Sequence, residues 1–364
     1  MYFDIKNEIK ARKLPDLFKF SDGTDVNSDN VSKRRMEMLE ILQKNVYGYV
    51  PDAPDKIDFY IEKIDDTRCC AGKAIYKEVR ITFPINDSKF SFPVKIMMPK
   101  AIKKAPFAVI ANFRGTLPDE YIPSEELIDR GIGFGVFCYT TDITSDDNDF
   151  SSGISGKIYK DGIRKSGSDC GKIAMWAYCA SRVLDYAINC EDIDREKTAV
   201  AGHSRLGKSA LLASACDERF KYVFSNNSGC AGAAVSRGKK GETVKNITDA
   251  FPYWFCKNYV SYAENEEKMP CDQHFLLAAT APRKVYVASA AEDFWADPLS
   301  EYISCIEAGQ FWRLYGKDAF PYIDSIPKPG DIICGSNIGY HIRSGVHFLS
   351  RYDWNAFLNF FLKQ

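Results

Sequence analysis

The chain has 364 residues, of which 45% are hydrophobic and 13% aromatic, so it can bury a large core. Its 48 basic and 49 acidic residues nearly cancel, which argues against a partner that recognises a large charge excess, such as nucleic acid or an anionic membrane. No run of about 18 apolar residues occurs, so no transmembrane helix is expected.

The N-terminal segment MYFDIKNEIKARKL contains acidic residues and lacks the apolar stretch of a signal peptide. We therefore expect a cytoplasmic chain, or a secreted chain whose leader has been removed. The 12 cysteines include no C-x-x-C pair, which argues against a zinc ribbon. Reduced, buried thiols are expected, and the count leaves one or two disulfides open.

The first hundred residues predict a helical segment followed by antiparallel strands. Apolar residues at helical spacing predict a helix over 31–44. Alternating apolar and polar residues predict three strands, at 57–64, 75–84 and 90–98. A turn at 86–88 joins the last two strands, so they form a hairpin. We expect residues 1–55 to wrap around the domain and the strands to form an antiparallel leading edge of a larger sheet.

From residue 105 onward, apolar strands alternate with helical patterns. The predicted strands lie at 106–113, 133–139, 197–202, 222–227 and 284–290. The predicted helices lie at 120–130, 173–189, 209–217 and 353–363. This alternation is typical of a mostly parallel sheet with helices on both faces. It predicts one α/β domain over residues 1–364.

The stretch 202–209 reads GHSRLGKS and fits two patterns. It matches the phosphate-binding loop G-x-x-x-x-G-K-[ST], and it nearly matches the elbow G-x-S-x-G that carries a serine nucleophile. Both patterns need a helix N-terminus, whose free N–H groups hold a phosphate or an oxyanion. The bulky residues His203, Arg205 and Leu206 argue against a loop that wraps a phosphate. The second glycine, however, comes one place late for the elbow.

A serine elbow also requires an acid and then a histidine further along the chain. Ser204 supplies the nucleophile, although a helix N-cap is the ordinary role of serine at this position. The strand at 284–290 runs into Glu292 and Asp293. A loop predicted at 339–347 contains His347, and His341 in the same segment is the competing candidate for the base.

Five motifs occur in a fixed order: GHSRLGKSAL, SNNSGCAGAA, FPYWFC, SAAEDFWADP and HIRSGVHFLSRYDW. Together they resemble the glucuronoyl esterases, carbohydrate esterase family 15, and in particular the bacterial branch. The resemblance extends from about residue 47 to the C-terminal helix. It implies an α/β-hydrolase fold, a three-layer sandwich, that needs no metal or cofactor. It also implies hydrolysis of the ester between a 4-O-methyl-glucuronate branch of xylan and a lignin-type alcohol, through a glucuronoyl-enzyme intermediate.

The resemblance also assigns individual residues. It identifies Ser204 as the nucleophile, His347 as the base and Arg205 as an oxyanion residue. Sugar-binding residues follow from it as well: Lys208, Glu242 and Trp295. Many members of the family have a glutamate where this chain has Asn227. Some bacterial members place the acid after the next strand instead, which here indicates Asp293, with Glu292 as the alternative.

Several alternatives remain open at this point. Lys208 and Glu242 could be solvated surface residues, and Trp295 could be a core residue. An acetyl xylan esterase or sugar deacetylase would use the same triad, whereas a P-loop protein would bind a nucleotide at 202–209. A binding protein that has lost catalysis would account for Asn227. We expect a monomer whose partner is a glucuronoxylan-derived ester.

Overall fold

The computed structural model describes residues 4–363 and is built around a mixed β-sheet. Within the described residues the sheet has ten strands in the order β1-β2-β3-β5-β4-β6-β7-β8-β10-β9. Their bounds are Asp58–Asp65 (β1), Ala74–Ile85 (β2), Ser88–Pro99 (β3), Ala105–Asn112 (β4), Gly133–Cys138 (β5), Ile193–His203 (β6), Tyr222–Asn226 (β7), Lys284–Ala290 (β8), Ile332–Cys334 (β9) and Ile338–Arg343 (β10).

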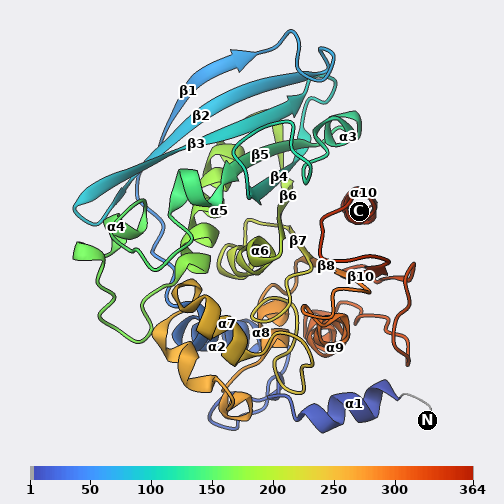
Figure 1. Ribbon diagram of the computed structural model, residues 1–364. Coiled ribbons are helices and arrows are strands. Elements are labelled where there is room, and N and C mark those ends of the chain that lie inside the picture. The colour runs from blue at the N-terminus through green and yellow to red at the C-terminus, as the bar shows by residue number, and fades with distance from the viewer. Residues whose placement is uncertain (1–3, 364) are drawn as a thin grey trace.

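Strands β1, β2 and β3 form an antiparallel edge of the sheet, as the alternating sequence predicts. The β2–β3 pairing runs without a break from Ala74↔Pro99 to Ile85↔Ser88. The tight turn between them places Asn86 in the left-handed region, at φ 48°, which asparagine tolerates better than most residues. In Figure 1 these strands lie at the top of the molecule.

The central strands β5, β4, β6, β7, β8 and β10 are parallel to one another. Most of their residues are buried, because helices cover both faces of the sheet. Parallel strands bring their carboxyl ends to one edge, where ligand sites of open α/β sheets lie. The loops that follow β4, β6, β7, β8 and β10 therefore meet at this edge.

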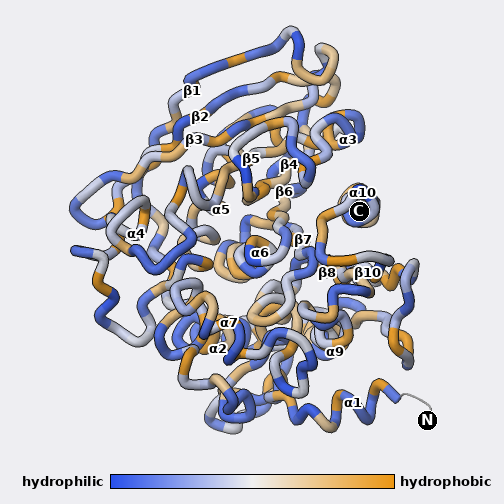
Figure 2. The backbone as a smooth tube through the Cα atoms, in the orientation of Figure 1, coloured by the Kyte–Doolittle hydropathy of each residue, from blue (hydrophilic) through white to orange (hydrophobic). Residues whose placement is uncertain are grey.

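Ten α-helices cover the sheet and its ends within the described residues. They are Ile5–Arg12 (α1), Val31–Leu42 (α2), Ser124–Asp129 (α3), Ser155–Ile158 (α4), Lys172–Asn189 (α5), Arg205–Cys216 (α6), Val244–Ala250 (α7), Gln273–Ala278 (α8), Pro298–Gly309 (α9) and Arg351–Leu362 (α10). Helices α3 and α10 share one apolar cluster with the sheet, and α5, α6 and α9 belong to the larger cluster on the opposite face. The molecule thus has the predicted three layers, and Figure 2 shows hydrophobic positions concentrated where those layers meet.

One predicted segment differs from the structure. The sequence predicts a loop at 339–347, but Ile338–Arg343 form strand β10, which pairs in parallel with β8. Its polar members His341 and Arg343 are buried, so the strand lacks the apolar run that identifies a central strand in a sequence. Only the residues after Arg343 form the loop that leads into α10.

The remaining features concern the N-terminal segment, the cysteines and the length of the helices. Helices α1 and α2 lie in the predicted N-terminal wrap, and residues 1–3 lie outside the described part. All 12 cysteines are free thiols. Across residues 4–363, no helix combines the length and the apolar character needed to cross a bilayer.

Candidate active site

Ser204 lies at the sharp turn between strand β6 and helix α6. Its backbone angles, φ 58° and ψ −127°, are unusual for a residue other than glycine and indicate local strain. A Cβ atom on Gly202 would lie 2.1 Å from the Leu206 carbonyl oxygen, and one on Gly207 would lie 3.0 Å from the Ser228 Cβ. Both glycines therefore allow strand and helix to approach closely, even though the second comes one place later than in the usual elbow pattern.

The Ser204 hydroxyl is available for chemistry. Within residues 4–363 it makes no capping hydrogen bond to the first turn of α6, and the residue is half-buried. The Ser204 backbone N–H donates to the Asn226 carbonyl at 2.9 Å, which fixes the elbow against β7. The first N–H groups of a helix have no partner inside the helix and lie at its positive end. The N–H of Arg205 is therefore suited to bind an oxyanion.

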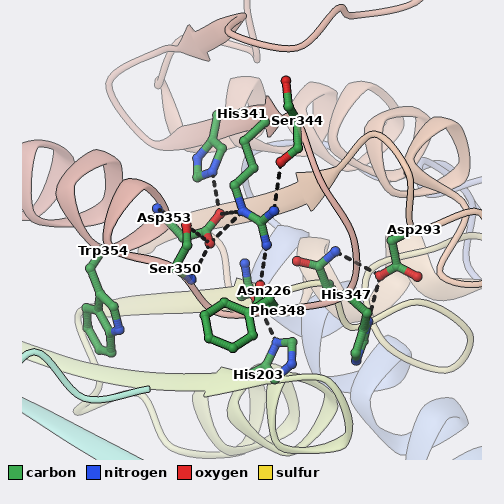
Figure 3. Close-up of polar contacts among 12 residues, drawn as sticks. His203, Asn226, Asp293, His341, Ser344, His347, Phe348, Ser350, Asp353 and Trp354 are labelled. Carbon is green, nitrogen blue, oxygen red and sulfur yellow. Dashed lines mark hydrogen bonds and ion pairs between the residues drawn. The ribbon is translucent and has the colours of Figure 1, made fainter. Parts of the chain in front are cut away.

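His347 and Asp293 form a close hydrogen-bonded pair beside this elbow (Figure 3). The His347 Nδ1 lies 2.6 Å from the Asp293 Oδ2, and Asn227 Nδ2 donates to the same oxygen at 2.8 Å. Burial alone would raise the pKa of Asp293. The hydrogen bonds from His347 and Asn227 outweigh that effect, so the pKa lies below its usual value and the carboxylate stays ionised.

The competing acid and the competing histidine are used elsewhere. Glu292 is exposed, and its carboxylate accepts a hydrogen bond from the Gly345 N–H at 3.0 Å. His341 is completely buried in β10, between the Tyr286 hydroxyl at 3.0 Å and Asp353 at 2.9 Å. Glu292 therefore supports the backbone of the histidine loop, and His341 does not reach a surface where a substrate could bind.

The ring of His203 packs against the ring of His347 next to the elbow. The two imidazole rings lie 4.6 Å apart between centroids, and His203 directly precedes Ser204 in the chain. Burial lowers the pKa of His203 to about 3, and its Nδ1 lies 2.6 Å from the Asn226 Oδ1. His203 is therefore neutral and packs against His347 without repelling it when His347 is charged. The side chain of His347 is 42% exposed, so a substrate can reach it.

Arg205, the residue after the serine, points its side chain into an aromatic box. Its guanidinium lies 4.5 Å from the Trp254 ring centroid and pairs with Asp146, and its Nε is buried without a partner among the described residues. Asp146 also accepts from Trp254 Nε1 at 2.6 Å and from the Tyr139 hydroxyl at 2.8 Å. The sequence analysis did not identify Asp146, because it lies 59 residues before Arg205 in an ordinary polar loop.

Lys208, on the first turn of α6, and Glu242 lie together and are not solvated, with 4% and 8% of their surfaces exposed. The Lys208 Nζ donates to the carbonyls of Ser228 and Cys230, and it lies 4.0 Å from the Glu242 carboxylate. Burial lowers the pKa of Lys208, and Glu242 opposes that change. Three acceptors around one ammonium leave a poor environment for a polyphosphate, which argues against the nucleotide interpretation of this loop.

Trp295 is 57% exposed and is therefore not a core residue. Its carbonyl accepts from the Glu242 N–H at 2.8 Å and from Lys239 Nζ at 3.1 Å, which ties the two loops together. Asp297 strengthens this link by accepting from the Lys240 N–H at 2.8 Å. Trp295 and Glu242 are thus held in a fixed relation next to the acid loop.

Metal binding requires a cluster of suitable ligands. Among the described residues, His, Cys, Asp and Glu side chains form no group of three that could hold a metal ion. The chemistry available at this edge of the sheet is that of a hydroxyl, an imidazole–carboxylate pair and a helix N-terminus.

Comparison with known proteins identifies the relatives of this chain. Residues 81–319 match the family model described as glucuronyl esterase of fungi. The chain is 35% identical to carbohydrate esterase MZ0003 from an unknown prokaryotic organism, over 97% of this chain and 90% of that protein. It is 30% identical to 4-O-methyl-glucuronoyl methylesterase 1 of Wolfiporia cocos, over 81% of this chain and 70% of that protein.

Solved structures give the same result. The glucuronoyl esterase from Solibacter usitatus superposes with a TM-score of 0.85 at 30% identity, over 96% of this chain and 97% of that one. The enzyme from Teredinibacter turnerae, a glucuronoyl esterase of carbohydrate esterase family 15, superposes with a TM-score of 0.88 at 25% identity, over 98% and 90% of the two chains. These neighbours have the α/β-hydrolase fold, so the predicted fold class is confirmed.

Proposed function

This chain belongs to the glucuronoyl esterase family, and we propose that it is a serine esterase that cleaves the ester between a 4-O-methyl-glucuronate branch of xylan and a lignin-type alcohol. One observation carries the proposal. The His347–Asp293 pair lies against the elbow that holds Ser204, and Lys208, one turn further along α6, forms a buried pair with Glu242.

The first step forms an ester between enzyme and substrate. His347 accepts the Ser204 proton through Nε2, because Nδ1 is occupied by Asp293, and the serine oxygen attacks the uronate carbonyl carbon. The ionised Asp293 fixes the tautomer of His347 and stabilises the imidazolium that forms. His347 then returns the proton to the departing alcohol oxygen.

The developing negative charge is stabilised at the N-terminus of α6. We assign this role to the backbone N–H of Arg205, which is the first residue of the helix. In a comparable hydrolase, loss of one oxyanion donor costs about 3 kcal/mol of transition-state stabilisation. Water activated by His347 then attacks the glucuronoyl-enzyme, which releases the uronic acid and regenerates Ser204.

The sugar half of the substrate accounts for the second pair. Lys208 donates and Glu242 accepts, so together they match neighbouring hydroxyl groups of a pyranose ring. The exposed Trp295 ring offers a flat apolar surface to the same sugar. An acetyl group has no hydroxyls for Lys208 and Glu242 to bind, so this pair favours a uronate ester over the deacetylase alternative.

Hydrolysis of benzyl glucuronate, methyl glucuronate and p-nitrophenyl acetate by the same preparation tests this proposal. We expect turnover of the glucuronate esters with a higher kcat/KM than that of the acetate, and no turnover of either by Ser204→Ala. Hydrolysis of the acetate alone would support the deacetylase. Failure of a fluorophosphonate probe to label Ser204 would support a binding protein without catalysis, and protection by Mg-ATP against thermal unfolding would support a nucleotide site.

A further inference from the structure

One guanidinium group binds three backbone carbonyls of the loop that carries His347. Arg343, the last residue of β10, donates from Nη1 to the Ser344 carbonyl at 2.9 Å and from Nη2 to the carbonyls of Val346 and Phe348. The Nη2–Val346 distance is 3.3 Å. Val346 and Phe348 are the two neighbours of His347 in the chain, so Arg343 binds the backbone on both sides of the histidine.

Arg343 is in turn fixed from below by Asp353, in the first turn of α10. The Arg343 Nε lies 3.0 and 2.8 Å from the two Asp353 oxygens. Asp353 is completely buried and also accepts from His341 at 2.9 Å and from the Ser350 N–H and hydroxyl, both at 2.7 Å. Burial would raise the pKa of Asp353, but His341 and Arg343 outweigh it and hold the pKa below its usual value, so the anchor stays charged.

Both ends of the histidine loop are therefore attached to regular structure. Asp353 caps α10 through Ser350, and β10 ends at Arg343. On the opposite side, the Gly345 N–H bonds to Glu292 and His347 bonds to Asp293. Without Arg343, the carbonyls that flank His347 would lose their donors, and the ring would be oriented by its contacts with residues 292–293 and with His203.

We propose that Arg343 is a positioning residue for the esterase reaction: its planar fork, anchored on Asp353, sets the backbone on both sides of His347 and so aims the imidazole at Ser204. This inference rests on the proposed function, because it assumes that His347 transfers the proton. A guanidinium presents several donors in fixed directions, whereas a lysine ammonium is a point charge on a flexible stem. The substitution Arg343→Lys therefore keeps the charge but loses the fork.

Arg343→Lys should lower kcat much more than it changes KM. A displacement of about 1 Å in a reacting group costs on the order of 100-fold in rate, so we expect kcat for benzyl glucuronate to fall by about 10- to 100-fold. KM should change less than about twofold, because Lys208 lies on α6 and Glu242 and Trp295 lie on other loops. Labelling of Ser204 by a fluorophosphonate should slow by a similar factor as kcat, since it also needs a correctly placed base.

Arg182→Lys is the matched control. Arg182 forms a buried ion pair with Asp185 inside α5, with side-chain exposures of 3% and 10%. Within the described part of the chain, no hydrogen bond or ion pair joins it to the histidine loop. Urea unfolding of both variants measures the stability that each substitution removes. We expect Arg182→Lys to lose stability and keep kcat. If Arg343→Lys also keeps its kcat and its labelling rate, Arg343 has only a structural role and the proposal is wrong.

A second variant covers the case in which Arg343→Lys does not fold. The double substitution Arg343→Gln with Asp353→Asn removes both charges together, so no unpaired charge is buried. It leaves the three loop carbonyls without the guanidinium, and the same loss of kcat is expected. An unchanged kcat in a folded double variant would overturn the proposal. The p-nitrophenyl acetate reaction keeps the two claims separate: if only the acetate is hydrolysed, the uronate substrate is wrong, but the role of Arg343 is still measured.

Discussion

Asn227 donates a hydrogen bond to Asp293, and we predict that it assists catalysis through this bond. The substitution Asn227→Gly removes the amide without straining the backbone, because glycine accepts the φ of 47° found there. The lost bond, from Nδ2 to the ionised Asp293 Oδ2 at 2.8 Å, is worth about 1.5–3 kcal/mol. The Asn227 Oδ1, however, is buried without a partner among the described residues, and its removal relieves about 1–3 kcal/mol.

The lost hydrogen bond lowers the stability and the removal of the unpartnered oxygen raises it. Only the lost hydrogen bond affects catalysis. We expect the free energy of unfolding at neutral pH to stay within about 2 kcal/mol of the wild type. The kcat for benzyl glucuronate should fall by about tenfold, which corresponds to about 1.4 kcal/mol in the barrier, because Asp293 loses the donor that holds its Oδ2 toward His347.

The pH dependence of stability gives an independent check. The folded-state pKa of Asp293 is depressed, so its contribution to stability is fully present above the unfolded value of about 3.9 and is lost as the pH falls through the lower folded value. Without Asn227 the pKa rises, and that contribution shrinks. The stability of the wild type relative to Asn227→Gly in urea unfolding should therefore fall on acidification from pH 6 to pH 3. An unchanged kcat, together with a difference that does not depend on pH, would refute this account.

Four further substitutions test other parts of the site. Asp293→Asn should lower kcat by about 10³-fold or more, whereas Glu292→Gln should lower it less than about tenfold because it only loosens the Gly345 backbone. Steady-state kinetics on benzyl glucuronate rank the two variants, and the reverse order would assign the acid to Glu292. Lys208→Met should reduce kcat/KM for glucuronate esters at least tenfold more than for p-nitrophenyl acetate, and equal losses would remove Lys208 from the sugar pocket. Asp146→Asn should weaken the hold on Arg205 and lower kcat about tenfold, which the same ester assay measures; a kcat equal to the wild type would show that the pair does not support the oxyanion site.

The sequence was sufficient to predict the layers of the fold and the elbow. Apolar strands and amphipathic helices repeat with the periods that their burial requires, so the sheet, α5 and α6 were predicted near their actual bounds. The order of serine, acid and histidine is also visible along the chain. Asp293 was favoured over Glu292 in the sequence, and the structure brings Asp293 to His347.

The remaining features depend on partners that are distant in sequence. Strand β10 was predicted as a loop because His341 and Arg343 are polar, and their burial becomes acceptable only when Asp353 arrives from α10. Lys208 could equally have been a solvated lysine, since its acceptors at Ser228 and Cys230 belong to the next strand–loop unit. The local sequence pattern shows that a residue is polar, but not whether a residue distant in the chain will supply its hydrogen-bond or charge partner.

Two buried cations at this site make the same kind of contact but have different roles. Lys208 and Arg343 both donate to backbone carbonyls, at Ser228 and Cys230 in one case and at Ser344, Val346 and Phe348 in the other. Loops after parallel strands have no ladder of their own to hold them, so a buried donor that binds several carbonyls replaces the missing hydrogen bonds. Lys208 lies 4.0 Å from Glu242 and so forms part of the proposed sugar pocket. The donors of Arg343, in contrast, are used by Asp353 and by the loop carbonyls. One cation therefore serves recognition of the acyl sugar and the other serves the geometry of proton transfer, which is why their substitutions should separate into effects on substrate preference and effects on kcat.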